Sequence, residues 1–157
     1  MNAVLRPSAP ALQWTPMTVA EVERILPIEQ QVYSHPWTRG NFIDSLAAGH
    51  LGWVGSDGEH PVAYWVAMAV LDEFHLLNLA VARDRWGQGW GRVALQHMVA
   101  VAQERDSAQL WLEVRVSNLR AQAIYTAYGF RRVGERKRYY PAHNGEREDA
   151  IVMSRML

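Results

Sequence analysis

A glycine-rich segment, Gly87-Gln88-Gly89-Trp90-Gly91, constrains the fold of this chain more than any other feature. The residues before it, Phe74 to Val81, are apolar enough for a buried strand, and helical spacing of apolar residues begins at Arg92. Alternate glycines between a strand and a helix leave backbone N–H groups free, and the helix start adds partial positive charge. We therefore predict an anion site with pyrophosphate as its ligand, although an ordinary glycine-rich turn has the same composition.

Two other phosphate-binding motifs fit this segment less well. A dinucleotide-binding G-x-G-x-x-G motif needs a glycine where Arg92 stands. Glu113 does lie about 20 residues further on, at the place of a ribose-binding acid, so this alternative stays open. A Walker loop is excluded because no Lys-Ser/Thr pair follows the glycines.

The composition narrows the class of protein. The chain has 157 residues and no cysteine, which excludes thiolate catalysis, cysteine-based zinc sites and a disulfide framework. We expect residues 1–10 to be a flexible leader and residues 11–157 to form a single domain with its own core. The longest apolar stretch, Pro61 to Leu71, is far shorter than the roughly 20 residues of a membrane span. With no signal-peptide core at its start, the chain is expected to be cytoplasmic, without membrane contact.

The charge is balanced overall but unevenly distributed. The 16 basic and 16 acidic side chains argue against direct nucleic-acid binding. Residues 1–75 carry three basic and eight acidic side chains, whereas residues 76–157 carry 13 basic and eight acidic ones. Only Lys137 among the basic residues is lysine, and guanidinium groups suit phosphate. The six histidines form no close helical pair, so no metal site is expected. Charges scattered over a solvated surface would explain the division as well as a functional role would, so both explanations stay open here.

Apolar periodicity predicts an α+β fold around one mixed sheet. The expected order is a strand, two helices, three strands, a helix, a strand, a helix and two strands. The strands are expected near 12–14, 51–55, 61–70, 74–81, 109–116, 131–139 and 149–156, and the helices over 18–33, 38–49, from 92 onward and from 117 or 118 to 129.

Local signals predict how the helices begin and end. Thr18 and Glu21 have the spacing of a capping box, and Pro27 is expected to kink or break the first helix. Gly49 and Gly129 are suited to the position just after a helix, where a left-handed backbone is common.

The glycine segment resembles the acetyl-CoA loop of the GCN5-related N-acetyltransferases (GNAT), which has the form Gln/Arg-x-x-Gly-x-Gly/Ala. Here the loop reads Trp86-Gly87-Gln88-Gly89-Trp90-Gly91, so Trp86 replaces Gln or Arg, with Arg85 one residue earlier. The resemblance implies the GNAT fold, a mixed, mostly antiparallel sheet of about six to seven strands flanked by about four helices. It also implies acetyl-CoA as co-substrate, without a metal.

Within that superfamily the chain is similar to the ribosomal-protein alanine N-acetyltransferases, the RimI branch. Leu-Trp-Leu-Glu-Val-Arg at 110–115 and Arg-Tyr-Tyr-Pro at 138–141 are the most specific matches. Other matching stretches lie at 28–29, 35–37, 70–73, 78–81, 117–118, 123–125, 128–130 and 148–151, so the resemblance covers nearly the whole chain.

The resemblance assigns roles to particular residues. Glu113 matches the general base, which must obtain a neutral amine from an α-amino group of pKa about 8. Tyr125 matches the general acid that protonates the leaving CoA thiolate. The other matches are expected to bind acetyl-CoA: Leu79, Ala80 and Val81 through their backbone, the loop residues Gly87, Gln88, Gly89, Trp90, Gly91 and Arg92, and Asn118. A salt-bridged strand residue, a core tyrosine and a helix-capping asparagine would explain Glu113, Tyr125 and Asn118 equally simply.

By the same resemblance, the acceptor is the N-terminal alanine of a small-subunit ribosomal protein, whose tail is typically basic. We expect direct transfer in a ternary complex, since without cysteine no cysteinyl acyl-enzyme can form. Trp37, Tyr139 and Tyr140 are candidate walls of the peptide groove, and the enzyme is expected to be a monomer. The acidic half is a candidate attractor of the basic tail, through Glu29, Asp44, Asp72 or Glu73.

Three alternatives stay open at this point. The acceptor of a GNAT enzyme of this kind can instead be a lysine side chain or a small amine. A CoA-binding sensor or assembly partner without catalysis belongs to another class, but it would need neither Glu113 nor Tyr125. A dinucleotide-binding domain would bind NAD(P) in place of acetyl-CoA.

Overall fold

The computed structural model describes residues 11–157, and the predicted flexible leader, residues 1–10, lies outside the described residues. Its centre is a seven-stranded sheet in the order β1-β2-β3-β4-β5-β7-β6. All neighbouring strands are antiparallel except β4 and β5, which are parallel. The strands are β1 (Gln13–Pro16), β2 (Leu51–Asp57), β3 (His60–Val70), β4 (Glu73–Val81), β5 (Gln109–Arg115), β6 (Arg131–Pro141) and β7 (Arg147–Met156).

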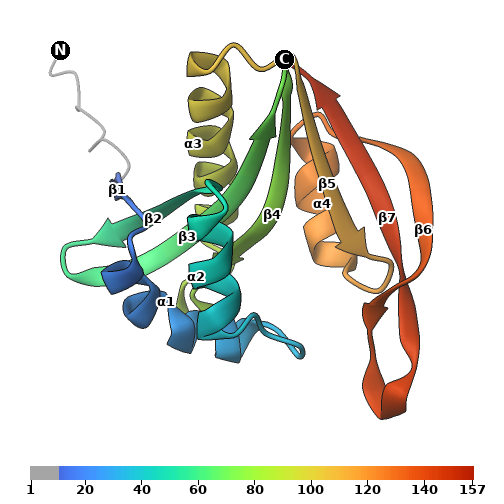
Figure 1. Ribbon diagram of the computed structural model, residues 1–157, viewed down its shortest axis with the longest axis horizontal. Helices are drawn as coiled ribbons and strands as arrows, with labels where there is room; N and C mark the ends of the chain where they lie inside the picture. The colour runs from blue at the N-terminus through green and yellow to red at the C-terminus, as the bar shows by residue number, and fades with distance from the viewer. Residues whose placement is uncertain (1–10) are drawn as a thin grey trace, which may run out of the picture.

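Four α-helices cover the two faces of this sheet (Figure 1). They are α1 (Val19–Val32), α2 (Arg39–Ala47), α3 (Trp90–Glu104) and α4 (Leu119–Ala127). Helices α1 and α2 share one apolar cluster with β2, β3 and β4, whereas α3 and α4 pack into a second cluster on the opposite face. The predicted α+β class, the mixed and mostly antiparallel sheet and the number of helices are confirmed.

The start of α1 differs from the prediction. The Thr18 side chain makes no capping hydrogen bond, and the carboxylate of Glu21 pairs with Arg24 at 2.6 Å instead of reaching back to the backbone. The predicted capping box at this helix is therefore wrong. Pro27 lies inside α1 without ending it, and its position is exposed, where water can solvate the carbonyl that a proline leaves unpaired.

The other helix ends follow local chemistry closely. A capping box does form at α2, where Thr38 and Asn41 bond each other's backbone N–H groups at 3.1 and 2.9 Å. Gly49 and Gly129 have φ values of 89° and 94° just after α2 and α4, as predicted. Helix α3 begins at Trp90, two residues before the expected start.

A group of aromatic rings surrounds one histidine of α3. The ring of His97 stacks on Trp14 with 4.1 Å between centroids, and Trp65 Nε1 donates a hydrogen bond to its Nδ1 at 3.1 Å. Trp53 packs edge-on against the same ring at 5.2 Å. Burial lowers the pKa of His97 from its usual 6.5 to about 4, so the ring is neutral and accepts the Trp65 proton. The neutral form is therefore part of the packing between α3 and the sheet.

Within residues 11–157, no helix has the length and apolar character needed to cross a membrane.

Candidate active site

The parallel strands β4 and β5 separate after a short paired segment. Their register runs only from Glu73 opposite Gln109 to Leu76 opposite Leu112, although both strands continue further. A bulge in β4 at Leu77 accompanies this divergence, since consecutive β3 residues pair with positions on either side of Leu77. Figure 1 shows the two strands diverging from their common end. Between them lies a cavity of about 1260 Å³, bounded by the α1–α2 connection, the glycine segment and α4.

The β4 side of the cavity has a free strand edge. Leu79, Ala80 and Val81 all line the cavity, as expected, and β5 does not pair with them. The carbonyl of Leu79 accepts a hydrogen bond from the Tyr33 hydroxyl, and that of Val81 accepts one from Trp86 Nε1 at 2.8 Å. An unpaired edge of this kind can bind an extended chain as an added strand does.

The glycine segment follows β4 and leads into α3. Gly87 and Gly89 have φ values of 77° and 87°, a left-handed conformation that favours glycine. Gly89 is the N-cap of α3, and no side chain caps the N–H groups of the first turn, while Gly87, Gly89 and Gly91 all line the cavity. Backbone donors and the helix dipole together make this end of the cavity suitable for phosphate.

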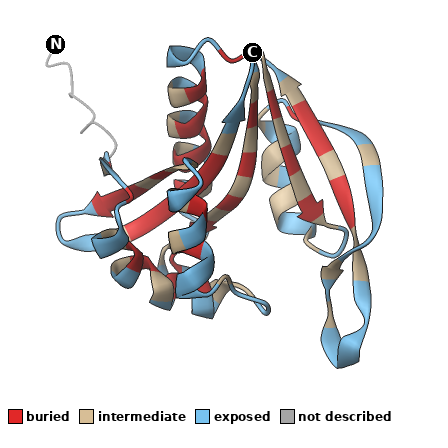
Figure 2. Cartoon of the chain, in the orientation of Figure 1, coloured by how far each residue is buried: buried red, intermediate tan, exposed pale blue. Residues whose placement is uncertain are grey.

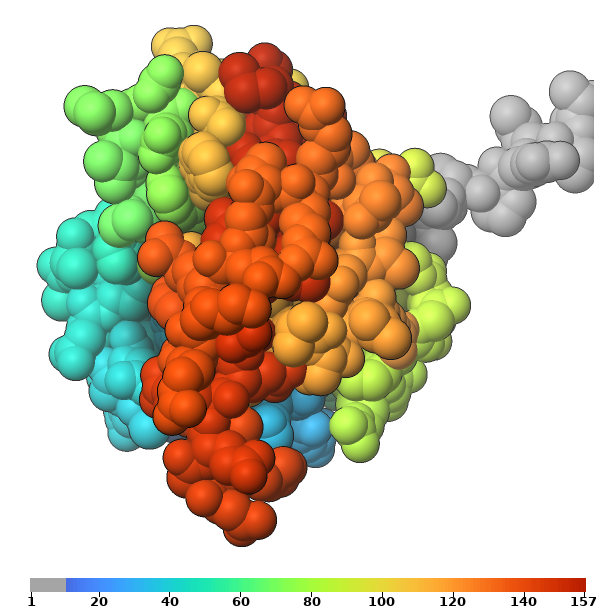
Figure 3. Space-filling model, turned by 90° about the vertical axis from the view of Figure 1, so that its right-hand side faces the viewer, coloured from blue at the N-terminus to red at the C-terminus, as the bar shows by residue number. Residues whose placement is uncertain are grey.

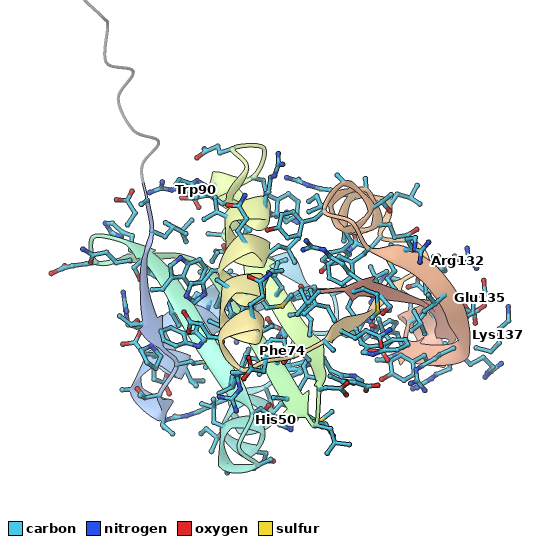
Figure 4. The ribbon with its side chains drawn as sticks, turned by 90° about the horizontal axis from the view of Figure 1, so that it is seen from above. His50, Phe74, Trp90, Arg132, Glu135 and Lys137 are labelled. Carbon is cyan, nitrogen blue, oxygen red and sulfur yellow. The ribbon has the colours of Figure 1, made fainter. Side chains whose placement is uncertain are left out.

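The side chains of the loop differ in whether they line the cavity. Arg85 and Arg92 line the cavity. Gln88 does not; its amide oxygen accepts a hydrogen bond from Trp90 Nε1 at 3.0 Å. Trp90 borders the cavity, but its ring is buried among residues that include Leu12. Figure 4 shows Trp90 at one end of α3. Gln88 was predicted to bind acetyl-CoA as part of the loop; its side chain does not line the cavity, and the binding role of the loop stays a prediction.

Glu113 reaches the cavity from β5. As the alternation of the sequence predicts, Leu112 and Val114 are buried on one face of this strand and Glu113 lies on the other. Its side chain is 21% exposed, and Arg136 Nε lies 3.2 Å from Oε1 in a hydrogen bond. A carboxylate that is partly buried and open to a cavity can accept a proton.

Tyr125 and Asn118 face the cavity from α4 and its start. The Tyr125 ring packs on Phe130 with 5.8 Å between centroids, and burial raises the pKa of its hydroxyl to about 12. The hydroxyl is therefore protonated at neutral pH and can donate. Asn118 is the N-cap of α4, where Oδ1 accepts from Ala121 N at 3.1 Å, so its structural role is present alongside its place on the cavity wall.

A buried polar network at the cavity wall was not predicted. Glu29 is 1% exposed and accepts hydrogen bonds from the Tyr64 hydroxyl, from Trp37 N at 3.0 Å and from Asn78 Nδ2 at 3.1 Å. Burial raises the pKa of this carboxyl, while the bonds from Tyr64, Trp37 and Asn78 oppose the shift. The network joins α1 to β3, β4 and the α1–α2 connection. In the sequence, Glu29 shares the apolar helical stripe, which was the available signal that its carboxylate is inside.

A second unpredicted residue, Tyr33, lines the cavity at the end of α1. Burial raises the pKa of its hydroxyl well above the usual value, with further contributions from Tyr125, Glu29 and Tyr140 nearby. Because its apolar spacing matches the rest of the helix, the sequence did not distinguish Tyr33 from an ordinary core residue.

The three expected acceptor-binding aromatics are not equivalent. Trp37 and Tyr140 line the cavity, Trp37 packing on Phe42 at 5.1 Å and Tyr140 lying under the Arg115 guanidinium at 4.6 Å. Tyr139 is 43% exposed, does not line the cavity and lies below Arg136 at 5.5 Å. The difference arises where the register of β6 shifts between Arg136 and Tyr140. Figure 3 shows the β6–β7 hairpin across the middle of the face that is turned toward the viewer.

The acidic residues expected to attract a basic tail are also dispersed. Asp44, Asp72 and Glu73 do not line the cavity, and Glu29 is buried and hydrogen-bonded. Around the cavity the described acids are Glu29 and Glu113, whereas Arg85, Arg92, Arg115 and Arg120 contribute positive charge. Among residues 11–157, no group of three or more His, Asp or Glu side chains is placed to hold a metal ion.

Comparison with known proteins defines the class to which this fold and cavity belong. Residues 22–130 match the sequence profile of the Acetyltransferase (GNAT) family. The crystal structure of the ribosomal-protein-S18-alanine N-acetyltransferase from Escherichia coli superimposes with a TM-score of 0.85 at 34% identity, covering 92% of this chain and 93% of that one. Ard1 from Thermoplasma volcanium has the same fold, with a TM-score of 0.82 at 20% identity over 94% of this chain and 99% of that one.

Two relatives in sequence carry the same name. The [ribosomal protein bS18]-alanine N-acetyltransferase of Escherichia coli K12 is 39% identical over 127 residues, which are 81% of this chain and 85% of the relative. That of Haemophilus ducreyi is 34% identical over 137 residues, 87% of this chain and 94% of the relative. The chain belongs to the GNAT family of acetyltransferases.

Proposed function

We propose that the protein transfers an acetyl group from acetyl-CoA to the α-amino group of the N-terminal alanine of ribosomal protein bS18. The named activity of the two sequence relatives supports the acceptor. The observation that carries the chemistry is the position of Glu113 and Tyr125 on the walls of one cavity whose end is the glycine segment. In this role the enzyme acts in the cytoplasm as a monomer.

The residues present fit acetyl-CoA. The N–H groups of Gly87 to Gly91, with Arg85 and Arg92, would hold the pyrophosphate at the start of α3. The free edge of β4 from Leu79 to Val81 would hold the extended pantetheine arm. These contacts would direct the thioester into the cavity that Glu113 and Tyr125 also line.

Glu113 is proposed as the base, directly or through one water molecule. The α-ammonium group loses a proton to the carboxylate, and its nitrogen attacks the thioester carbonyl, forming a C–N bond. Backbone N–H groups of β4 stabilise the oxyanion that develops. As the intermediate collapses, the C–S bond breaks and the sulfur takes a proton from the Tyr125 hydroxyl, while the nitrogen releases its remaining extra proton to solvent. Solvent later returns a proton to Tyr125 and removes the proton held by Glu113.

Transfer is proposed to be direct. The chain contains no cysteine to form a thioester with the acetyl group. Both substrates must then be present together, and one cavity of about 1260 Å³ is lined by the glycine segment as well as by Trp37 and Tyr140. Trp37 and Tyr140 would form the walls at the acceptor end, between the α1–α2 connection and the β6–β7 hairpin.

The proposal is tested by incubating the protein with acetyl-CoA and a basic peptide that begins with alanine, then locating the added acetyl group by mass spectrometry. Labelling of the α-amine is expected. A control peptide with the same sequence and a blocked N-terminus should remain unlabelled. Labelling of a lysine side chain instead would favour the broader amine acetyltransferase, and CoA binding without any transfer would favour a non-catalytic sensor.

A peptide series refines the acceptor. Peptides that begin with alanine and differ only in the charge of the following residues are compared at low and high salt. If the tail is recognised by charge, added salt should raise KM more for the basic peptide than for the neutral one. Equal salt effects on both peptides would show that the charge of the tail does not determine which acceptor is chosen.

A further inference from the structure

Trp86 is fixed in position at the mouth of the cavity. It lies between β4 and the first glycine of the loop and lines the cavity. Its only side-chain donor, Nε1, bonds the carbonyl of Val81 at 2.8 Å, so it has no polar group left for a ligand. What the half-buried side chain still offers is the face of its indole ring.

Two guanidinium groups lie over that ring. Arg120 Cζ is 4.4 Å from the ring centroid and Arg83 Cζ is 5.2 Å from it, both within the range of a cation–π interaction. Arg120 comes from the first turn of α4, which is a separate element from the glycine segment, and it lines the cavity. Arg83 comes from the short 3₁₀ turn before Trp86 and does not line the cavity.

The charge of Arg120 is not used by a carboxylate. Arg85 and Arg115, which also line the cavity, are paired with Asp57 and Glu148 at 3.1 Å. In the part of the chain that the structure describes, no salt bridge engages Arg120. A stacked guanidinium keeps its N–H groups in the plane of the fork, free to donate to an anion.

We propose that Trp86 is a positioning residue that holds Arg120 across the cavity mouth, where its guanidinium binds a phosphate group at the nucleotide end of acetyl-CoA. The inference rests on the proposed function, which supplies acetyl-CoA as the donor. The indole acts through Arg120: it restricts a long, flexible side chain to one place, so less conformational entropy is lost when phosphate binds.

The role predicts a specific pattern of ligand dependence. Losing a phosphate contact should weaken binding of a ligand that carries phosphate and leave a ligand without phosphate unaffected. Losing a general structural element should weaken both. CoA, dephospho-CoA and acetyl-pantetheine differ in this respect, since the first has a ribose 3′-phosphate and a pyrophosphate, the second only the pyrophosphate, and the third neither.

The experiment measures dissociation constants of the three ligands by titration calorimetry for the full-length wild type and for Arg120→Ala, Trp86→Leu, Trp86→Phe and the double variant Trp86→Leu/Arg120→Ala. Arg120→Ala should weaken CoA binding about tenfold, as expected for one charge-assisted contact. Trp86→Leu should weaken CoA binding at least threefold relative to wild type. The double variant should bind CoA at most about twofold more weakly than Arg120→Ala alone. Trp86→Phe keeps an aromatic face and should retain most of the affinity.

Arg83→Ala is the matched control, because it removes a guanidinium from the same ring but not from the cavity. Its effect on CoA affinity should stay below about twofold. Acetyl-pantetheine binding should be the same in all variants. Titration with dephospho-CoA identifies which phosphate Arg120 contacts. If Arg120→Ala also weakens the binding of dephospho-CoA, the contact is with the pyrophosphate. If it weakens only the binding of CoA, the contact is with the ribose 3′-phosphate.

Several results would overturn the inference. One is an unchanged CoA affinity in Arg120→Ala; another is additive losses in the double variant; a third is an equal loss for acetyl-pantetheine. Melting temperatures of all variants identify any that fail to fold, and if Trp86→Leu is one of them, the ligand dependence of Arg120→Ala decides the test. Wild type that binds CoA but does not acetylate the alanine peptide would contradict only the proposed acceptor, whereas wild type that fails to bind CoA would contradict both proposals.

Discussion

The two walls of the cavity are built differently. On one wall, which we call the β4 wall, β3, β4, α1 and α3 place large side chains such as Trp65, Phe74 and Leu95 completely inside the protein. On the other, the β5 wall of β5, α4, β6 and β7, neither α4 nor β6 has a single buried residue. Figure 2 shows this contrast as buried residues on the β4 wall and exposed ones along α4 and β6.

On the β5 wall the buried residues come from β5 and β7, among them Leu110 and Leu112, and polar and cation–π contacts supplement them. Arg115 bonds Glu148 at 3.1 Å and the Pro141 carbonyl at 2.9 Å, while its guanidinium covers Tyr140. The Glu148 carboxylate also accepts from Ser117 N at 2.8 Å. Both proposed catalytic groups, Glu113 and Tyr125, belong to this wall. Substitutions on the β5 wall are therefore expected to change rates, and substitutions on the β4 wall to change stability.

Glu113→Gln should give the largest effect. Without the carboxylate, only the neutral fraction of the acceptor amine reacts, so kcat/KM at neutral pH should fall about 100-fold. The loss should shrink as the pH rises above the amine pKa of about 8, because the base is then no longer needed. The measurement is the pH profile of acetyl transfer. Glu135→Gln, on the outer edge of the sheet in Figure 4, is the control and should behave as wild type. An unchanged profile in Glu113→Gln would contradict the assignment.

Glu29→Ala tests the β4 wall. The change leaves the Tyr64 hydroxyl, the Asn78 amide and the Trp37 N–H buried without their acceptor. We expect the free energy of unfolding, measured by urea titration, to fall by about 2–3 kcal/mol. Glu23→Ala, which breaks only an exposed pair with Arg39, should cost about 0.5 kcal/mol or less. Equal effects of the two substitutions would mean that the network does not stabilise this wall.

Tyr125→Phe should lower kcat about tenfold while leaving the dissociation constant of acetyl-CoA nearly unchanged. Because burial raises the Tyr125 pKa to about 12, the wild-type rate should not decline on the alkaline side up to about pH 10. Tyr128→Phe is the matched control on the same helix, since Tyr128 packs under Arg155 and does not line the cavity. A normal kcat in Tyr125→Phe would exclude this hydroxyl as the acid.

His97 gives the smallest expected effect, on the β4 wall. Folding lowers its pKa from 6.5 to about 4, so the unfolded chain binds the proton more tightly. The stability it contributes is complete above pH 6.5 and is lost as the pH falls toward 4, by about 1 kcal/mol once solvent screening is allowed for. Unfolding curves at several pH values measure this slope. His97→Phe should reduce it and exposed His60→Gln should not; equal slopes in all three proteins would contradict the role of the neutral ring.

Contiguous segments of the sequence predicted their own structure well. The order of strands and helices, the glycine turn before α3 and the left-handed Gly49 and Gly129 all depend on neighbouring residues, so local rules suffice. The capping box expected at Thr18 failed because Glu21 had a closer partner in Arg24. Thr18 and Glu21 both have side chains suited to a capping box, but the sequence does not show whether the Glu21 carboxylate bonds the backbone or Arg24.

The acceptor side depends on contacts between distant residues, and here the sequence was less informative. Tyr139 and Tyr140 are adjacent and lie on opposite faces of β6, but the register shift between Arg136 and Tyr140 meant that the sequence did not show which of the two faces the cavity. The burial of Glu29 requires donors from residues 37, 64 and 78, which no local pattern connects. Resemblance to a family supplied the candidates, and packing distinguished among them.

We propose that one cavity holds both substrates at the same time and that the acetyl group passes between them directly. Initial velocities measured over a grid of acetyl-CoA and alanine-peptide concentrations test it. Transfer in a ternary complex should give double-reciprocal lines that intersect. Parallel lines, together with an acetylated protein isolated in the absence of peptide, would show a covalent intermediate and contradict the account.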